Sequence, residues 1–140
     1  YVPVDVDEVG LNWWDYAGTE NESKYNEDTL RCATKMAEGK NLIFVSCLNP
    51  IDYFQKIDVP EEIETTHWIA LCPSDDVIEQ RLKARPAERG FTSDEIIRPH
   101  IEYNGWFRRN KSKFQLLIDN TEKAEEETAE LIASYILKVN

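Results

Sequence analysis

The chain has 140 residues, 41% of them hydrophobic and 31% charged, which is the balance of one globular domain with a buried core. It carries 27 acidic and 16 basic residues, and its formal net charge of −11 argues against nucleic acids and anionic membranes as partners. No apolar run approaches the roughly 20 residues that cross a bilayer, and no signal-peptide pattern opens the sequence. The three cysteines form no CxxC pair, which argues against a disulfide framework or a zinc knuckle. We therefore predict a single cytoplasmic domain over residues 1–140.

The first third of the chain alternates apolar strand patterns with one helical pattern. Residues 1–6 predict a short strand, and because the sequence begins within this pattern we expect further residues before Tyr1. Apolar side chains three to four residues apart predict a helix over residues 22–38, and Gly39 is a typical stop. Leu42–Val45 is a compact apolar run between turn residues, a pattern typical of a strand buried on both faces.

The rest of the chain continues this alternation. Two more apolar runs predict strands at residues 66–72 and 114–118. Ser74 is placed to cap a helix after the first of them, and a capping-box pattern at residues 92–95 predicts the start of a second helix. A final helix is predicted over residues 121–139. Strands and helices thus alternate along the whole chain.

Alternating elements with continuous apolar strands predict an α/β fold, in which a parallel sheet lies between two layers of helices. In such folds ligands bind beyond the carboxyl ends of the strands. Residues that directly follow a predicted strand are therefore candidates for a site. They are Asp5, Asp7, Glu8, Ser46, Cys47, Asn49, Cys72, Pro73, Ser74, Asp119, Asn120 and Thr121.

Residues 81–113, called here the basic segment, hold 9 basic and 4 acidic residues in an otherwise acidic chain. Arginines predominate among its bases, and their planar fork suits two-point contact with phosphate or carboxylate. Arg81 and Arg85 are one helical turn apart, and Arg89 follows in a polar loop. The alternative interpretation is a solvated helix face without a ligand.

Asp5 and Asp7 are two positions apart at the end of a predicted strand. On an extended chain both carboxylates project from the same side, where they are suited to hold Mg²⁺ and to accept a proton from an attacking hydroxyl. The alternative interpretation is a pair of turn-forming aspartates.

Three aromatic residues, Trp13, Trp14 and Tyr16, follow in a segment too rich in Gly, Asn and Asp to form regular structure. Aromatic side chains on a loop either stack on the ring of a ligand or cover the edge of the core. The sequence leaves both interpretations open.

Several of these motifs resemble those of the P-loop small-molecule kinases. The helix Asp76-Val-Ile-Glu-Gln-Arg81-Leu-Lys-Ala-Arg85 looks like the one that leads into the lid of gluconate kinases, with shikimate kinases and the nucleoside-kinase-like and zeta-toxin-like ATPases nearby. Asp5-Val-Asp7 is similar to the DxD after the second strand of these proteins. Phe44-Val-Ser46-Cys47 resembles their third strand, and Ile118-Asp-Asn-Thr121 resembles the loop after their last strand. The resemblance covers nearly the whole chain.

The resemblance implies a role for each of these positions. Asp5 serves Mg²⁺ and the substrate, and Asp7 is the catalytic base or the anchor of the substrate hydroxyl. Ser46, Trp13 and Trp14 face the substrate.

In the second part of the chain, the resemblance implies that Arg81, Arg85 and Arg89 close over ATP as catalytic lid groups that neutralise the transferred phosphoryl group. Arg81, Asn120 and Thr121 bind the nucleotide. The implied cofactors are ATP and Mg²⁺.

One defining element of that family is absent from these residues: the glycine-rich GxxxxGKS or GxxxxGKT loop that cradles the phosphates. In the shikimate-kinase-type sheet order 2-3-1-4-5, the strand before this loop is the central one. The resemblance therefore implies a P-loop NTPase-like fold, a three-layer parallel sheet sandwiched by helices, in which the first strand and the P-loop precede Tyr1.

The predicted function is that of an ATP-dependent phosphotransferase, a kinase, for a small acceptor. The aromatic residues at the start of the substrate region favour a nucleoside or nucleotide. A sugar acid such as gluconate is the alternative acceptor, although no arginine follows Ser46 in residues 47–52 as such a kinase is expected to show. A further alternative is a non-catalytic α/β binding module, in which the basic segment contacts an acidic partner.

Overall fold

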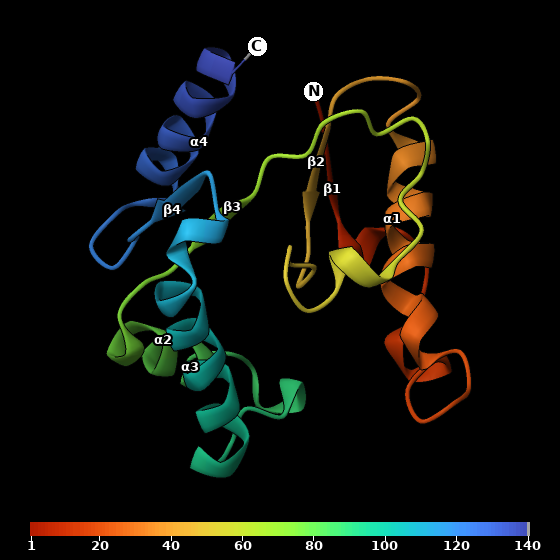
Figure 1. Cartoon of the computed structure of the whole chain (residues 1–140). Coiled ribbons are helices and arrows are strands. Elements are labelled where there is room, and N and C mark those ends of the chain that lie inside the picture. Colours follow the sequence, from red (N-terminus) through yellow and green to blue (C-terminus); the bar gives the residue numbers. More distant parts are fainter. Residues whose placement is uncertain (140) are drawn as a thin grey trace. The chain divides into compact units, whose positions relative to one another are not determined.

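The computed structural model describes residues 1–139, which divide into two compact units, one formed by Tyr1–Thr66 and one that begins at His67 (Figure 1). Each unit contains its own pair of parallel strands. We describe the units separately, and the single-domain interpretation stays a prediction.

The first unit is built on a β-α-β arrangement. Strand β1 (Val2–Asp5) pairs in parallel with β2 (Leu42–Val45), and the helix α1 (Tyr25–Met36) connects them and lies alongside the pair (Figure 1). The segment between β1 and α1 holds short 3-10 turns rather than regular structure, as its composition predicts. The core of the unit is small, with Val4 of β1 and Leu30 of α1 almost fully buried.

Helix α1 follows the expected pattern of charge and apolar spacing. Glu27 and Asp28 lie in its first turn, where acidic side chains interact favourably with the helix dipole. The helix ends at Met36, two residues before the predicted end. After the C-cap Ala37, Glu38 and Gly39 have φ values of +50° and +75°, and this left-handed backbone ends the helix before Gly39.

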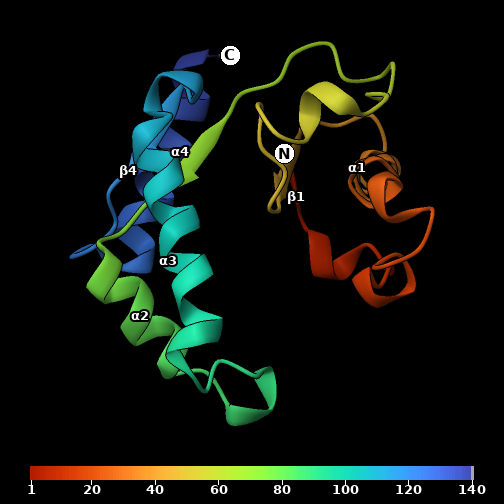
Figure 2. The ribbon, with the colours of Figure 1, turned by 60° about the horizontal axis from the view of Figure 1, so that its bottom comes forward.

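The second unit also pairs two parallel strands, β3 (Ile69–Leu71) and β4 (Leu116–Ile118). Two helices connect them, α2 (Asp75–Lys83) and α3 (Asp94–Arg109), and these helices lie side by side (Figures 1 and 2). A last helix, α4, follows β4. It spans Glu125–Val139.

The helix starts of the second unit agree with the predicted caps only in part. The Ser74 hydroxyl accepts a hydrogen bond from the Val77 amide at 3.4 Å, so the predicted cap of α2 is present. Helix α3 begins after Ser93, whose side chain makes no capping hydrogen bond, and the predicted capping box at residues 92–95 does not form. Ile97, only 1% exposed, is the most deeply buried large side chain of this helix.

The predicted fold class is wrong. The strands expected in one parallel sheet instead form two separate sheets of two strands, and no three-layer sandwich with a large sheet is present in residues 1–139. The apolar runs correctly predict that these segments are strands, but they do not predict which strands pair. An apolar side chain packs equally well against any apolar surface. Burial is also weaker than predicted, since Val45 is 53% exposed and Leu71 45% exposed. Within the described residues, no helix has both the length and the apolar character needed to cross a membrane.

Candidate functional site

The predicted carboxylate pair lies at the carboxyl end of β1, but on a turn rather than an extended chain. Asp5 is the N-cap of the 3-10 turn Val6–Glu8: its Oδ1 accepts a hydrogen bond from the Asp7 amide at 2.9 Å. The Asp5 amide donates to Glu8 Oε2 at 3.2 Å, which completes a capping box. The extended chain assumed for both carboxylates therefore ends at Asp5, and Asp7 lies in the turn.

Ser46 and Cys47 follow β2 at the same end of this strand pair, since Asp5 lies opposite Val45 in the register. The pKa of the Cys47 thiol is raised, first by desolvation and then by the negative charges of Asp7 and Asp5. Although Cys47 is exposed at the surface, the two carboxylates are near enough to disfavour its thiolate. The structure therefore brings the residues after β1 and β2 into one electronegative neighbourhood.

Asp5 is the residue with an implied Mg²⁺ role. Within residues 1–139, no three His, Cys, Asp or Glu side chains form a group that holds a metal ion by protein ligands alone. Mg²⁺ in phosphotransfer sites needs only one or two carboxylates, because phosphates and waters supply the remaining oxygens. Asp5 uses one carboxylate oxygen in its cap, and a carboxylate accepts several hydrogen bonds or ligands. The Asp5 carboxylate thus keeps the capacity to contact a cation that is shared with a phosphate.

The aromatic segment divides into packed and exposed members. Trp13 and Tyr16 both pack edge-on against Tyr25. Their ring centroids lie 5.2 Å and 5.3 Å, respectively, from the Tyr25 centroid. Trp14 is 78% exposed. The Asn12 side chain accepts a hydrogen bond from the Trp14 amide at 3.1 Å and so fixes the turn Trp13–Asp15. Two aromatic residues therefore cover the start of α1, and one remains open to solvent.

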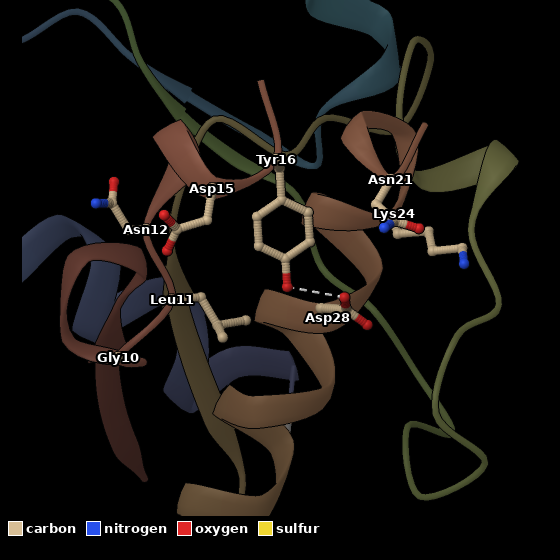
Figure 3. Close-up of a pocket in the computed structure, with 8 residues that line it drawn as sticks. All are labelled: Gly10, Leu11, Asn12, Asp15, Tyr16, Asn21, Lys24 and Asp28. Carbon is tan, nitrogen blue, oxygen red and sulfur yellow. Dashed lines mark hydrogen bonds between the residues drawn. The ribbon is translucent and has the colours of Figure 1, made fainter. Parts of the chain in front are cut away.

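Beside this aromatic cluster lies a pocket of about 550 Å³ between Gly10 and Asp28 (Figure 3). The Tyr16 ring stands in it, and its hydroxyl donates a hydrogen bond to Asp28 Oδ2 at 2.9 Å. This hydrogen bond is the main reason that the pKa of Tyr16 is raised. Trp13 and Trp14, the predicted substrate residues, do not line the pocket.

The sequence analysis missed most of the polar groups that line this pocket. They are Asn12, Asp15, Asn21, Lys24 and Asp28. Four of them belong to irregular chain or to 3-10 turns, where no periodicity marks which side chains face inward. The available signal was the high density of polar residues around the predicted aromatic site.

In the second unit, the residues after β3 and β4 also meet. The Ser74 amide donates a hydrogen bond to Thr121 Oγ1 at 2.7 Å. The Thr121 hydroxyl and amide in turn donate to Asp119 Oδ1, at 2.5 and 3.0 Å, and these two bonds hold the pKa of Asp119 below its usual value. A smaller pocket of about 350 Å³ lies beside this loop and is lined by Ser74, Asp119 and Thr121 together with Glu122 and Lys123.

The predicted nucleotide residues Arg81, Asn120 and Thr121 come together at this loop. Arg81, from α2, donates a hydrogen bond from Nη2 to the Asn120 carbonyl at 3.1 Å. The Asn120 side chain is buried, and its Oδ1 has no hydrogen-bond partner. An acceptor that is buried and unpaired costs about 1–3 kcal/mol, so native structures rarely contain one without a reason.

The other predicted lid arginines do not share this place. The Arg85 guanidinium lies over the Phe91 ring, 5.1 Å from its centroid, in a cation–π contact. Arg89 is exposed in the 3-10 turn Ala87–Arg89. Gly90 follows with a φ of +82°, which favours glycine at this position. Arg81 thus contacts the strand-end loop, and Arg85 and Arg89 belong to the loop between α2 and α3.

One arginine of the basic segment has a structural contact that the sequence analysis did not identify. Arg108, in the last turn of α3, forms an ion pair with Asp75 and donates from Nη1 to the Pro73 carbonyl at 2.9 Å. Asn104 Nδ2 donates to the same carbonyl at 2.8 Å and to Asp75 at 3.3 Å. The hydrogen bond from Arg108 is the main cause of the lowered pKa of Asp75. Arg108 and Asn104 therefore fix the loop between β3 and α2.

Comparisons of the chain with models of protein families, with curated proteins and with solved structures find no match. The resemblance to P-loop kinases accordingly stays a prediction. What the structure adds is the grouping of the predicted residues at the strand ends of each unit.

Proposed function

We propose that the protein is an ATP-dependent phosphotransferase that binds the nucleotide base at the loop after β4. The observation that supports this proposal most is the Asn120 side-chain oxygen, which is buried without a partner in the loop whose backbone Arg81 contacts. The resemblance to P-loop kinases implies nucleotide contacts for Arg81, Asn120 and Thr121.

The chemistry of Asn120 fits an adenine ring. An amide oxygen accepts a hydrogen bond, and the exocyclic amino group of adenine donates one. A bound base that reaches this oxygen would remove the cost of the unpaired acceptor. The neighbouring pocket, beside Asp119 and Thr121, is polar and open enough to admit a ligand edge. Asn120 itself does not line this pocket, so a base held there reaches the Asn120 oxygen only if the loop around Asn120 rearranges.

In the first unit, we assign the acceptor side of the reaction to the residues after β1 and β2. Asp7 serves as the base for the acceptor hydroxyl, and Asp5 as a carboxylate ligand of Mg²⁺. Ser46 contacts the acceptor. An ATP-consuming enzyme of this kind works in the cytoplasm, as the composition predicts.

A second candidate is a protein that binds nucleotide without transferring phosphate. The observation in its favour is the capping role of Asp5, which is the turn interpretation of the carboxylate pair. This candidate shares the Asn120 site and differs only in the absence of turnover.

The test compares two buried asparagines of the intact natural protein. Asn120→Leu removes the unpaired oxygen while keeping the volume, so we expect the free energy of unfolding to rise by about 1 kcal/mol. ATP affinity, measured by calorimetric titration, is expected to fall at least ~10-fold, since one hydrogen bond to the base is lost.

Asn104→Leu is the matched control, because the Asn104 amide is buried and hydrogen-bonded, and its loss is expected to lower stability. Unchanged ATP affinity in Asn120→Leu contradicts the nucleotide site. ATP binding without phosphate transfer to any of a nucleoside, a nucleoside monophosphate, gluconate or shikimate contradicts the phosphotransferase and leaves the second candidate.

A further inference from the structure

The pocket between Gly10 and Asp28 has the size of a small-molecule site. Its volume of about 550 Å³ falls within the roughly 300–1,000 Å³ that is usual for ligand pockets. Its central ring is held in place, since Tyr16 is fixed by the hydrogen bond to Asp28 and by the edge-on contact with Tyr25. The pocket is therefore built around an anchored aromatic side chain.

Three polar side chains around this ring are available to a ligand. Within residues 1–139, the Asp15 carboxylate, the Asn21 amide and the Lys24 ammonium group make no hydrogen bond or ion pair. Figure 3 shows Asp15 on one side of the Tyr16 ring, and Asn21 with Lys24 on the other. The pocket thus offers an acceptor on one side and donors on the opposite side.

The charge around the pocket disfavours an anionic ligand. Residues 10–28 contain five acidic residues and one basic residue, Lys24. Lys24 is also near enough to Glu27 to contribute, after stronger causes, to the lowered pKa of that carboxylate. The whole first unit holds 14 acidic and 5 basic residues. A phosphate or a sugar-acid carboxylate would therefore enter a negative field.

We propose that this pocket binds an uncharged nucleoside whose base carries an exocyclic amino group. The Asp15 carboxylate accepts from that amino group, and Asn21 and Lys24 donate to carbonyl or hydroxyl oxygens on the other side. Asp28 keeps Tyr16 in position. This inference rests on the proposed function, because it names the acceptor of the phosphotransferase, and it selects the nucleoside over both the nucleotide and the sugar acid.

The test measures binding by calorimetric titration without ATP, in the intact natural protein. The probes are two pairs, cytidine with uridine and adenosine with inosine, in which a carbonyl replaces the amino group of the first member. Cytidine monophosphate, adenosine monophosphate and gluconate complete the set. We expect one amino nucleoside to bind at least ~10-fold more tightly than its carbonyl partner and than its monophosphate, by analogy with the loss of one charged hydrogen bond.

Asp15→Asn removes the charge and keeps the shape of an exposed side chain, so it is expected to fold normally. It should abolish most of the preference within the pair, because an amide offers a donor to the carbonyl of uridine or inosine. Asn21→Ala is the second variant and should weaken the binding of both nucleosides of a pair equally. Asp52→Asn, an aspartate of the same unit outside the pocket, is the matched control and should change neither.

The proposal is overturned if no nucleoside binds, if a monophosphate or gluconate binds more tightly than the nucleosides, or if Asp15→Asn leaves the preference intact. Because ATP is absent from the titration, these results are independent of phosphate transfer. Nucleoside binding in a protein that transfers no phosphate would refute the phosphotransferase while supporting the pocket.

Discussion

Each unit consists of a pair of parallel strands connected by one or more helices. The units differ in how the residues that follow their strands are held. In the second unit these residues are fixed by side-chain hydrogen bonds, from Arg108 and Asn104 to Pro73 and from Ser74 to Thr121. In the first unit the chain after β1 makes local turns and leaves an open polar pocket.

The two units also differ in net charge. The first unit holds 14 acidic and 5 basic residues, and the second holds the remaining 13 acidic and 11 basic residues. The second unit thus combines a fixed strand-end loop with nearly balanced charge, which suits the base and phosphates of a nucleotide. The first combines an open loop with strong negative charge, which suits an uncharged acceptor. Under the proposed function, the second unit therefore binds the nucleotide and the first unit binds the acceptor.

The strongest test of this division is kinetic. Asp7→Asn in the intact protein is expected to lower kcat by about 10²–10⁴-fold, the usual contribution of a general base, with little change in the KM for ATP. Asn120→Leu should instead raise the KM for ATP. Steady-state kinetics with both substrates varied will measure the two effects, and Asp52→Asn is the control. Should Asp7→Asn retain full kcat, the carboxylate pair has only its turn-forming role.

A second prediction concerns the core of the second unit. Ile97→Ala is expected to lower the free energy of unfolding by about 2–5 kcal/mol, because Ile97 is 1% exposed and its truncation leaves a cavity. The neighbouring Ile96 is 45% exposed, so Ile96→Ala should cost less than about 1 kcal/mol. Urea unfolding followed by circular dichroism checks both values. Equal losses in the two variants would mean that α3 packs through another face.

The smallest expected effects are in the pH dependence of stability, where Asp75 and Tyr16 respond at opposite ends of the pH range. The pKa of Asp75 is lowered mainly by its hydrogen bond from Arg108, so this carboxylate stabilises the folded protein above its ordinary pKa of 3.8. That contribution is lost as pH falls through the lower, folded value. Arg108→Met should therefore flatten the stability curve on the acid side of pH 4.

Tyr16 behaves in the opposite way. Its pKa is raised above 10.0 mainly by the hydrogen bond to Asp28, so its contribution is complete below pH 10 and is lost as pH rises through the folded value. Tyr16→Phe should flatten the curve on the alkaline side. Thermal melts from pH 2 to pH 11 will show whether each variant changes only its own end, and a change at the wrong end would contradict the assignment.

Local features of the fold were accessible from the sequence, whereas pairing was not. The apolar run Leu42–Val45 gives the bounds of β2 because turn residues flank it on both sides. The Ser74 cap of α2 was predictable because helix capping involves only residues within one turn of the serine. Which strands share a sheet depends instead on contacts between distant residues, and apolar content does not encode that choice.

In the candidate site, the positions that follow strands were predictable, but the geometry of the loops was not. Asn120 and Thr121 were identified because they follow a strand, and their position after β4 needs only the local pattern. Asp5 was identified for the same reason, but its capping turn was not, because a DxD motif is compatible with both an extended and a turning chain. Asp15 and Asn21 were missed, since irregular chain has no period from which an inward-facing side chain is inferred.

The two-stranded sheets also bear on how copies of the protein behave toward one another in solution. Every strand in such a pair has one edge that, among residues 1–139, carries no backbone partner from another strand. Open edges of this kind act as templates for association between molecules. The net charge of −11 opposes that association by repulsion between copies. Salt shortens the reach of this repulsion from about 10 Å at 0.1 M to about 3 Å at 1 M, so colloidal stability should decline as ionic strength rises.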